Sequence, residues 1–271
     1  MPIKPYWMYL LGLSAVVPLL NWDVTVSMVE LWQGSAYEHC YLIPFVTAYI
    51  LWRENEASQS LDWKGSLLGL IALLLSMIGL YAANVALIQL LEHVFVLLGT
   101  VAFVWAVAGT KVIVANWFAF AFLMLCLPVG DTLIPTLQKI TADLSTAGLA
   151  LFDIPAYREG MLITLPAGVF EVARACSGFR YLNAGIAVGA LIAYLNFSRI
   201  FTIALYIGFV LIVFVLMNGI RAFLTILIAA YSNMEYMTGE DHIYFGYVLF
   251  VLALYFIYRT AQYMQKRELH A

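Results

Sequence analysis

The long apolar run Ile200–Tyr231, in which Arg221 is the only charged residue, restricts the fold more than any other feature. A helix rises about 1.5 Å per residue, so about 20 apolar residues cross the hydrocarbon core of a bilayer. In that core every backbone polar group must be hydrogen-bonded within the protein, which leaves helices and closed barrels as spanning structures. The run therefore predicts a membrane helix that contains one cation. Because the run is longer than one crossing needs, we expect a bend at Asn218-Gly219 or a strong tilt.

Other apolar runs occur along the chain, and its composition agrees with them. Of its 271 residues, 64% are hydrophobic and 11% are charged, whereas soluble domains are about half apolar and about a quarter charged. We predict a polytopic membrane protein that forms one integral-membrane domain over residues 1–271. A net charge of −3 gives no reason to expect a nucleic-acid partner. Three cysteines do not make a disulfide framework, and we expect neither a metal nor a cofactor.

Hydropathy predicts an all-α fold with about eight transmembrane helices. Their approximate ranges are Tyr6–Leu20, Cys40–Trp52, Gly65–Tyr81, Ala86–Ala108, Val112–Pro128, Tyr181–Phe197, Ile200–Tyr231 and Ile243–Tyr258. The first is interpreted as a retained span, and an external loop is expected over Asn21–His39. Eight crossings place both termini and most Lys and Arg residues on one side, which the excess of basic residues identifies as the cytoplasm.

The remaining basic residues break this rule, because they fall on the external side or at its membrane edge. They are Lys139, Arg158, Arg174, Arg180 and Arg221. For Lys139 and Arg158 the better explanation is that a long external loop collects some charge. For Arg180 and Arg221 a functional site is the better explanation, because they lie where the other polar chemistry of the chain gathers.

The longest segment without a span follows Pro128. Apolar residues recur there at spacings of three and four, which predicts an external amphipathic helix on the membrane surface or over the bundle. These residues are Leu133, Leu137, Ile140, Leu144, Ala147 and Leu151. Two β-type runs, Met161–Leu165 and Val169–Val172, flank a Pro-Ala-Gly turn and predict a small external β-hairpin between spans 5 and 6.

Two pairs of neighbouring polar residues suggest chemistry but have simpler explanations. His39 and Cys40 are adjacent, and adjacent helical residues point about 100° apart, so we do not expect them to face each other as a catalytic pair. Glu92 and His93 lie inside span 4, where ionisable residues are functional candidates. We favour the interpretation that they form pairs that orient helices.

Three reactive residues from distant parts of the sequence are predicted at one depth of the external membrane edge. Cys176 precedes span 6 with Ser177 as helix cap, Arg221 lies one crossing after span 7 begins, and His242 opens span 8. Consecutive antiparallel spans are neighbours in most bundles. A helix N-terminus and nearby Arg cations favour the thiolate form of a cysteine such as Cys176. A histidine such as His242 can serve as base and acid. An arginine such as Arg221 can stabilise an oxyanion. Singly, each residue is better explained as core, solvated cap or snorkelling side chain.

At these residues the sequence resembles the exosortase/archaeosortase family of integral-membrane sorting enzymes. The motif A-C-S-G-x-R-Y-L stands at Ala175–Leu182, N-G-x-R-A at Asn218–Ala222, and D-H-x-x-x-G at Asp241–Gly246. The resemblance extends over essentially the whole chain, and three separate motifs in the family's order make it specific.

The resemblance implies a membrane-embedded cysteine protease or transpeptidase, with Cys176 as nucleophile, Arg221 as stabiliser and His242 as acid/base. The implied substrates are exported proteins with a C-terminal sorting signal, made of a Pro-Glu-Pro type motif, a transmembrane helix and a basic tail. Cleavage is expected at the outer face of the bacterial inner membrane through a Cys thioester. The cleaved protein would then pass to a surface acceptor, which the sequence does not identify.

Three further residues are candidates for substrate binding. Arg180 and Arg174 are expected to receive the substrate glutamate by charge complementarity, and His39 is a candidate from span 2. Two departures from the family leave the subfamily open: Cys40 replaces the usual glycine after the span 2 histidine, and Arg174 replaces the usual glutamate before Ala-Cys.

The alternative prediction is a non-enzymatic transporter or assembly partner for envelope or exopolysaccharide export, with the external arginines as an anion-binding vestibule. A transporter more naturally carries charges at mid-span and paired inverted repeats, and the sequence shows no repeat.

Overall fold

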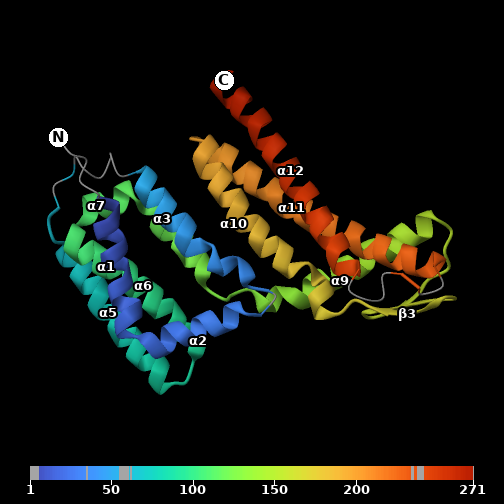
Figure 1. Ribbon diagram of the computed structural model, residues 1–271, viewed down its shortest axis with the longest axis horizontal. Coiled ribbons are helices and arrows are strands. Elements are labelled where there is room, and N and C mark those ends of the chain that lie inside the picture. Colours follow the sequence, from blue (N-terminus) through green and yellow to red (C-terminus); the bar gives the residue numbers. More distant parts are fainter. Residues whose placement is uncertain are drawn as a thin grey trace. The chain divides into compact units, whose positions relative to one another are not determined.

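The computed structural model describes residues 6–34, 36–54, 61, 63–232, 235–236 and 241–270, and for 241–243 and 269–270 it describes the backbone only. The described chain is mainly helical and contains one small sheet (Figure 1). It divides into two compact units, Met1–Val129 and Gly130–Ala271. The expectation of one domain over the whole chain stays a prediction.

Five of the described helical segments are long and apolar enough to cross a bilayer. They are α5 (Leu67–Val85), α6 (Gln89–Ala108), Arg174–Asn196, α11 (Ile200–Tyr231) and Tyr244–Glu268. The number rises to seven if two bent helix pairs each count as one span, so the expected count of eight is not confirmed. The expected span Cys40–Trp52 forms α3, Ile43–Arg53, whose 11 residues are fewer than the about 20 that a crossing needs.

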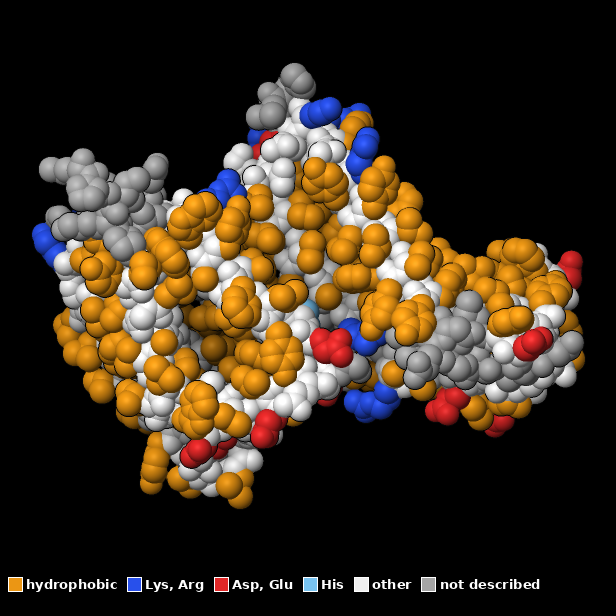
Figure 2. Space-filling view, in the orientation of Figure 1, with side chains coloured by type: hydrophobic (Ala, Val, Ile, Leu, Met, Phe, Trp, Pro, Cys, Tyr) orange, Lys and Arg blue, Asp and Glu red, His pale blue; other side chains and the backbone are white. Residues whose placement is uncertain are grey.

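The outer sides of these helices are strongly apolar. On α5, Leu68, Leu75 and Ile78 are more than 60% exposed, and Figure 2 shows hydrophobic side chains over most of the visible face of each unit. Soluble monomers rarely expose apolar patches of this extent. The apolar surfaces of both units are therefore suited to contact with lipid.

The first unit is built from short and long helices. They are α1 (Tyr6–Leu20), α2 (Trp22–Trp32), the 3-10 turn η1 (Glu38–Tyr41), α3, α5, α6, α7 (Thr110–Ala115), α8 (Trp117–Leu123) and the 3-10 turn η2 (Met124–Cys126). α5 and α6 pack as a hairpin, α1 packs on α6, and α3 packs on α8 (Figure 1).

The segment expected to be an external loop, Asn21–His39, is largely helical, so that expectation is wrong. α2 follows α1 after a bend of 98°. The bend lies at Asn21, whose backbone leaves the helical region and whose side-chain Nδ2 donates to Val17 O at 2.9 Å. Asp23 in the first turn of α2 suits the positive end of a helix dipole. The segment therefore contains the signals of a helix start, which its polar residues do not override.

Glu92 and His93 connect helices of the first unit. His93 is fully buried, and its Nε2 lies 3.0 Å from Ser27 Oγ on α2. Ser27 Oγ donates its only hydrogen to Val24 O at 2.9 Å, so His93 Nε2–H is the donor to Ser27. Glu92 Oε1 accepts from Asn84 Nδ2 at 3.0 Å. These bonds join α6 to α2 and to α5, as the structural interpretation of this pair predicts.

The expected span Val112–Pro128 is interrupted at Asn116, which separates α7 from α8. Asn116 is buried, and its Nδ2 donates to Val112 O at 2.9 Å. Asparagine side chains compete in this way with the hydrogen bonds of the helix backbone. Hydropathy alone does not register such a break.

The second unit contains a helical bundle and the sheet. Its elements are η3 (Asp131–Leu133), α9 (Ile134–Leu151), β1 (Tyr157–Glu159), β2 (Leu162–Leu165), β3 (Gly168–Glu171), the 3-10 turn η4 (Arg174–Ser177), α10 (Phe179–Asn196), α11 and α12 (Asp241–His270). α10, α11 and α12 pack against one another, and α9 packs along α11 (Figure 1).

The helix expected after Pro128 is α9, but the buried face differs from the predicted stripe. Leu133 and Leu151 of that stripe are 51% and 83% exposed, whereas Thr141 and Ser145 are buried. Small side chains let two membrane helices approach closely. Leu137 of the stripe is 8% exposed, so the buried face includes the stripe only in part, and its orientation towards the membrane surface stays a prediction.

The segment expected to form a hairpin belongs to a three-stranded antiparallel sheet in the order β1-β2-β3, and its external position stays a prediction. β2 and β3 correspond to the two predicted runs, and β1 was not predicted. On β2 the burial alternates, with Ile163 and Leu165 inside, as a half-buried strand requires. These two side chains join a cluster, called here the α9–sheet cluster, that consists of Ala142, Leu149, Ile163, Leu165, Val172 and Ile226.

α11 and α12 are connected at one end of the bundle by Glu268. Its Oε1 accepts from Ser198 N at 3.0 Å, Ser198 Oγ at 2.8 Å and Arg199 N at 3.0 Å. These donors precede the first turn of α11, where amides have no partner within the helix. α11 then continues for 32 residues and passes Asn218-Gly219 without an interruption of the helix.

The contact between α5 and α6 depends on Gly69. A Cβ at this position would come within 2.6 Å of Trp105 C and 2.7 Å of Ala106 Cα. We expect Gly69→Ala to lower the free energy of unfolding by about 1–3 kcal/mol, the usual cost of overpacking, because backbone atoms cannot move aside singly. Gly12→Ala is the matched control, since a Cβ there has no neighbour within 4 Å. Unfolding of the purified protein in detergent measures both, and equal stability would contradict the close approach.

Candidate active site

Cys176 lies in η4, the turn that leads from the sheet into α10. Its backbone N–H donates to Ala173 O at 2.8 Å. The side chain is half-buried and packs against the α9–sheet cluster. Cys176 is thus partly accessible and lies just before the N-terminus of a membrane helix, where a helix dipole favours negative charge.

Gly178 turns the chain from η4 into α10. Its φ of +80° belongs to the left-handed region, which glycine adopts without a steric cost. A Cβ there would also come within 2.7 Å of Asn218 Cβ. Gly178 occupies the N-cap position that Ser177 was expected to take, and Ser177 Oγ instead accepts from Phe179 N at 3.3 Å.

Asn218 connects the Cys176 turn to two helices. Its Nδ2 donates to Cys176 O at 3.0 Å and to Thr141 Oγ1 at 2.8 Å. Asn218 and Thr141 are 4% and 2% exposed. Because a carbonyl oxygen can only accept, the nitrogen of the amide must be the atom that faces Cys176 O. η4, α9 and α11 therefore meet at one buried amide.

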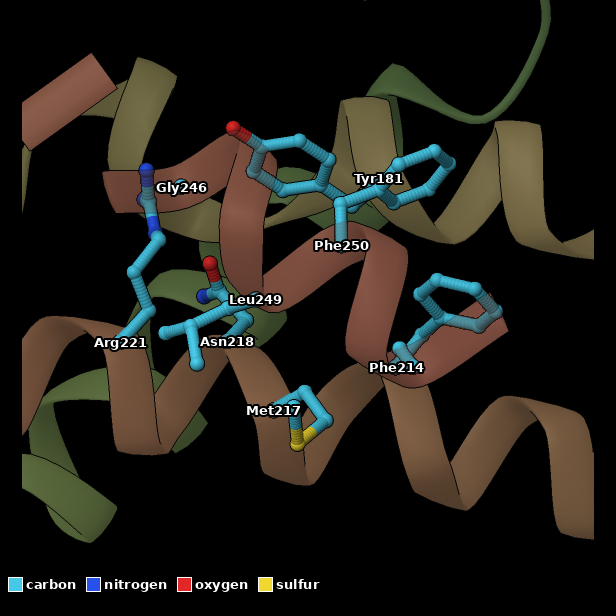
Figure 3. Close-up of a pocket in the computed structure, with 9 residues that line it drawn as sticks. Tyr181, Phe214, Met217, Asn218, Arg221, Gly246, Leu249 and Phe250 are labelled. Carbon is cyan, nitrogen blue, oxygen red and sulfur yellow. The ribbon is translucent and has the colours of Figure 1, made fainter. Parts of the chain in front are cut away.

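Arg221 lies one helical turn after Asn218 and is only 7% exposed. Its Cζ is 5.4 Å from the ring centroid of Tyr181 on α10, within the range of a cation–π interaction. A Cβ at Gly246 of α12 would lie 3.4 Å from Arg221 Cδ and 2.5 Å from Tyr181 Oη. Figure 3 shows Arg221 and Asn218 on the same side of α11, with Gly246 of α12 next to the guanidinium group. The absence of a side chain at Gly246 lets α12 close over this cation.

A cavity of about 10 Å³ lies between α10, α11 and α12, and its lining includes Tyr181, Asn218, Arg221 and Gly246. Two buried polar atoms of this lining, Asn218 Oδ1 and Arg221 Nε, have no hydrogen-bond partner among the described residues. One is an acceptor and the other is a donor, and the volume corresponds to about one water molecule. The site therefore retains unused hydrogen-bonding capacity beside its buried cation.

The backbone of His242 belongs to the first turn of α12, four residues before Gly246. Its side chain lies outside the described part of the structure. The contact of Gly246 with Arg221 thus fixes where the preceding turn of α12 runs.

Arg180 and Arg174 are placed differently. Arg180, on α10, is half-buried, its Nη2 donates to Tyr181 Oη at 3.2 Å, and its Cζ lies 5.1 Å from the Tyr181 ring centroid and 5.7 Å from that of Tyr247. Arg174 is exposed in η4. Arg180 and Arg221 therefore contact the same tyrosine, which concentrates positive charge at this end of α10.

Arg158 and Lys139 lie in the sheet and on α9. Arg158 forms an ion pair with Asp143, and its Nε donates to Gly160 O at 2.8 Å. This ion pair fastens β1 to α9. Lys139 is exposed. For Arg158 these contacts support a structural explanation.

The other two thiols belong to the first unit. Cys40 and Cys126 are 0% and 1% exposed. His39 Nε2 lies 3.7 Å from Cys40 Sγ, so the expectation that these neighbours do not face each other is wrong. The two side chains rotate towards each other, although consecutive residues of the 3-10 turn η1 point about 120° apart. Cys40 Sγ also donates to Leu125 O at 3.5 Å. A fully buried thiol of this kind cannot reach a substrate.

The second unit thus links the Cys176 turn to the helix of Arg221, while His39 belongs to the first unit. Sequence reasoning assigned no role to Asn218 or Tyr181. A polar amide one turn before Arg221, inside an apolar run, was an available signal for Asn218. Tyr181 stands in the motif A-C-S-G-x-R-Y-L, but the motif does not show its contacts, which depend on the approach of arginines from two helices.

Residues 31–259 match the family described as transmembrane exosortase. The chain belongs to this family. The matched range includes the Cys176 turn, the helix of Arg221 and most of α12. Among curated proteins and solved structures, none matches the chain. Exosortase membership makes this chain a membrane sorting protein in general terms and agrees with an enzymatic role.

His39 carries a testable pH dependence. Burial lowers its pKa from 6.5 to about 4, so the folded exosortase holds His39 neutral at neutral pH. Between these two values the unfolded chain binds a proton that the folded chain does not, so stability falls as the pH decreases from about 6.5 towards about 4. His39→Gln should remove this part of the pH dependence. Thermal unfolding in detergent from pH 8 to pH 4 measures the slope, and an unchanged slope would contradict the assignment.

Proposed function

We propose that this exosortase is a membrane cysteine transpeptidase. It cleaves the C-terminal sorting signal from an exported protein and transfers the cleaved protein to a surface acceptor. The observation that carries the proposal is the hydrogen bond between the Cys176 turn and Asn218, one turn from the buried Arg221. It brings a partly accessible thiol and a buried cation onto one framework. Burying a guanidinium is costly, and oxyanion stabilisation would explain why the site retains one.

In the proposed reaction His242 takes the proton of the Cys176 thiol, and the resulting thiolate attacks the carbonyl carbon of the scissile peptide bond. The tetrahedral intermediate collapses, the C–N bond breaks, and His242 returns the proton to the leaving amine. The product is a thioester between Cys176 and the new C-terminus of the exported protein. A nucleophile of the acceptor, or water, attacks this thioester and releases the thiol.

Arg221 is the proposed stabiliser of the oxyanion. The guanidinium is positioned by the face of Tyr181 and by α12 at Gly246. A fixed charge in a site with little water stabilises a developing negative charge more strongly than a mobile charge in water. The donor Arg221 Nε, which has no partner among the described residues, adds capacity for this role.

His242 is the proposed acid/base on the basis of backbone position. Residues four apart lie on the same side of a helix, and Gly246 of the same helix contacts Arg221 and Tyr181. The first turn of α12 is therefore a suitable place for a base that serves Cys176.

The proposed orientation follows from the basic residues at the end of the bundle defined by Glu268. Arg199, Arg259, Lys266 and Arg267 lie in the segments that meet there, and Figure 2 shows basic side chains near the C-terminal end. Excess basic residues mark the cytoplasmic side. Cys176, at the other end of α10, would then face the exterior of a bacterial inner membrane, with both chain termini in the cytoplasm. An exported protein with a transmembrane segment and a basic tail would reach this site in the same orientation.

Replacing the nucleophile tests the proposal. We expect Cys176→Ala, Cys176→Ser and Arg221→Ala each to reduce processing of a signal-bearing exported protein at least about 10³-fold, because each removes a group that acts in the reaction. Cys126→Ala is the matched control, since that thiol is buried in the first unit, and it should retain activity. Gel shifts of the precursor measure cleavage. Undiminished processing by Cys176→Ala would reject the enzyme and favour a non-enzymatic export partner.

Arg180 and Arg174 are proposed to receive the substrate glutamate by charge-assisted hydrogen bonds. We expect Arg180→Ala to lower kcat/KM about tenfold for a glutamate-containing motif and much less for the same motif with glutamine. The reason is that only the charged substrate loses an ion pair, whose hydrogen bonds contribute about 1.5–3 kcal/mol. Arg158→Ala is the control, because that arginine is paired with Asp143. Equal losses for the two substrates would reject this role.

A further inference from the structure

We propose that Asn218 is a positioning residue of the site, because its amide holds the Cys176 turn against the helix that carries Arg221. The inference rests on the proposed function for its catalytic consequence. The position of the Cys176 turn itself can be tested without a substrate.

The hydrogen bonds of Asn218 differ from those of three other asparagines of the helices in this chain. Asn21, Asn116 and Asn196 each donate to the carbonyl four residues before them in their own helical segment. Asn218 instead uses its Nδ2 for two other segments, η4 and α9. An amide has two hydrogens on this nitrogen, so its donor capacity is fully used by contacts that join separate elements.

The surroundings leave this amide little freedom. Asn218 is 4% exposed, and the backbone of Gly178 is so close that a Cβ there would lie 2.7 Å from Asn218 Nδ2. On its other side, Cys176 packs on the α9–sheet cluster. The turn is therefore held between a packed apolar cluster and a single directional bond.

The hydrogen bond from Asn218 to Cys176 O connects the segments that carry the two proposed reacting residues, Cys176 and Arg221. Asn218 and Arg221 are three residues apart on α11, a spacing that places them on one face of the helix. The position of the Cys176 carbonyl relative to the guanidinium is thus determined through one helical turn. Misplacement by about 1 Å can reduce catalysis about 100-fold, so a rigid connection of this kind has a direct catalytic consequence.

A merely structural role makes a different prediction from a positioning role. If Asn218 only satisfies buried polar groups, its loss should lower stability and leave the chemistry of the folded fraction unchanged. If it positions the turn, the thiol of the folded protein should become more accessible to a small reagent while processing becomes slower. The two readouts then move in opposite directions.

The test uses the full-length exosortase in detergent and measures alkylation of Cys176 by iodoacetamide between pH 6 and pH 10, with peptide mass spectrometry as the readout. The pH series separates a change in thiolate fraction from a change in access. Cys40 and Cys126 are buried and serve as internal references for folding. Asn196→Ala is the matched control, because that amide donates to Ile192 O in its own helix.

We expect Asn218→Ala to raise the alkylation rate constant of Cys176 about fivefold, as the loss of one hydrogen bond implies. The kcat for processing should fall at least about tenfold, with KM changed less than twofold. Asn196→Ala should leave both quantities within twofold of the wild type. A folded Asn218→Ala protein with unchanged alkylation and unchanged kcat would overturn the proposal, and so would a parallel fall of both.

Thr141 provides a second route if Asn218→Ala does not fold. Thr141→Val removes the other acceptor of the amide, and Thr141→Ser keeps the hydroxyl. The valine variant should show faster alkylation and slower processing, and the serine variant should restore both; equal behaviour of the two would overturn the proposal. Processing that survives Cys176→Ala would reject the proposed function, whereas the alkylation comparison would still decide whether Asn218 holds the turn.

Discussion

The second unit is organised around one buried cation. Arg221 is the single charged residue of a 32-residue apolar helix and is 7% exposed. Inside the helix bundle such a group has little access to water, so neighbouring helices must supply its contacts. Tyr181 of α10 presents its ring face, and α12 approaches at Gly246 because no side chain intervenes. The packing of α10, α11 and α12 at this level is therefore a response to the guanidinium.

The same scarcity of water explains the polar network beside Arg221. Buried polar groups are costly without hydrogen bonds, and here the amide of Asn218 serves a backbone carbonyl and a hydroxyl from two other elements. Small and hydroxyl-bearing residues of α9 make room for this arrangement. The result is a turn that is held firmly although it lies between a sheet and a membrane helix. Firm placement of the Cys176 turn against the helix of Arg221 suits the proposed acyl transfer, in which charge develops on an oxygen.

The three thiols show that residue type alone does not identify a reactive site. Cys40 has an imidazole at 3.7 Å and would attract attention as a thiol–imidazole pair. It is nevertheless fully buried, while Cys176 is partly accessible. Ser27 and His93 make the same point, because the serine hydrogen is already donated to a backbone carbonyl. Access and the direction of each hydrogen bond distinguish a candidate nucleophile from a structural pair.

By itself, the sequence determined the membrane class, the long spans and the motif residues Cys176, Arg221 and His242. Hydropathy and motifs are local properties, and they survive in any packing of the chain. Only the tertiary structure decided the buried face of α9, the helix α2 in place of a loop, the added strand β1 and the short length of α3. It also decided that Asn218 reaches across to the Cys176 turn and that Tyr181 contacts two arginines. These features depend on which elements approach each other and how closely, and no spacing along one segment contains that information.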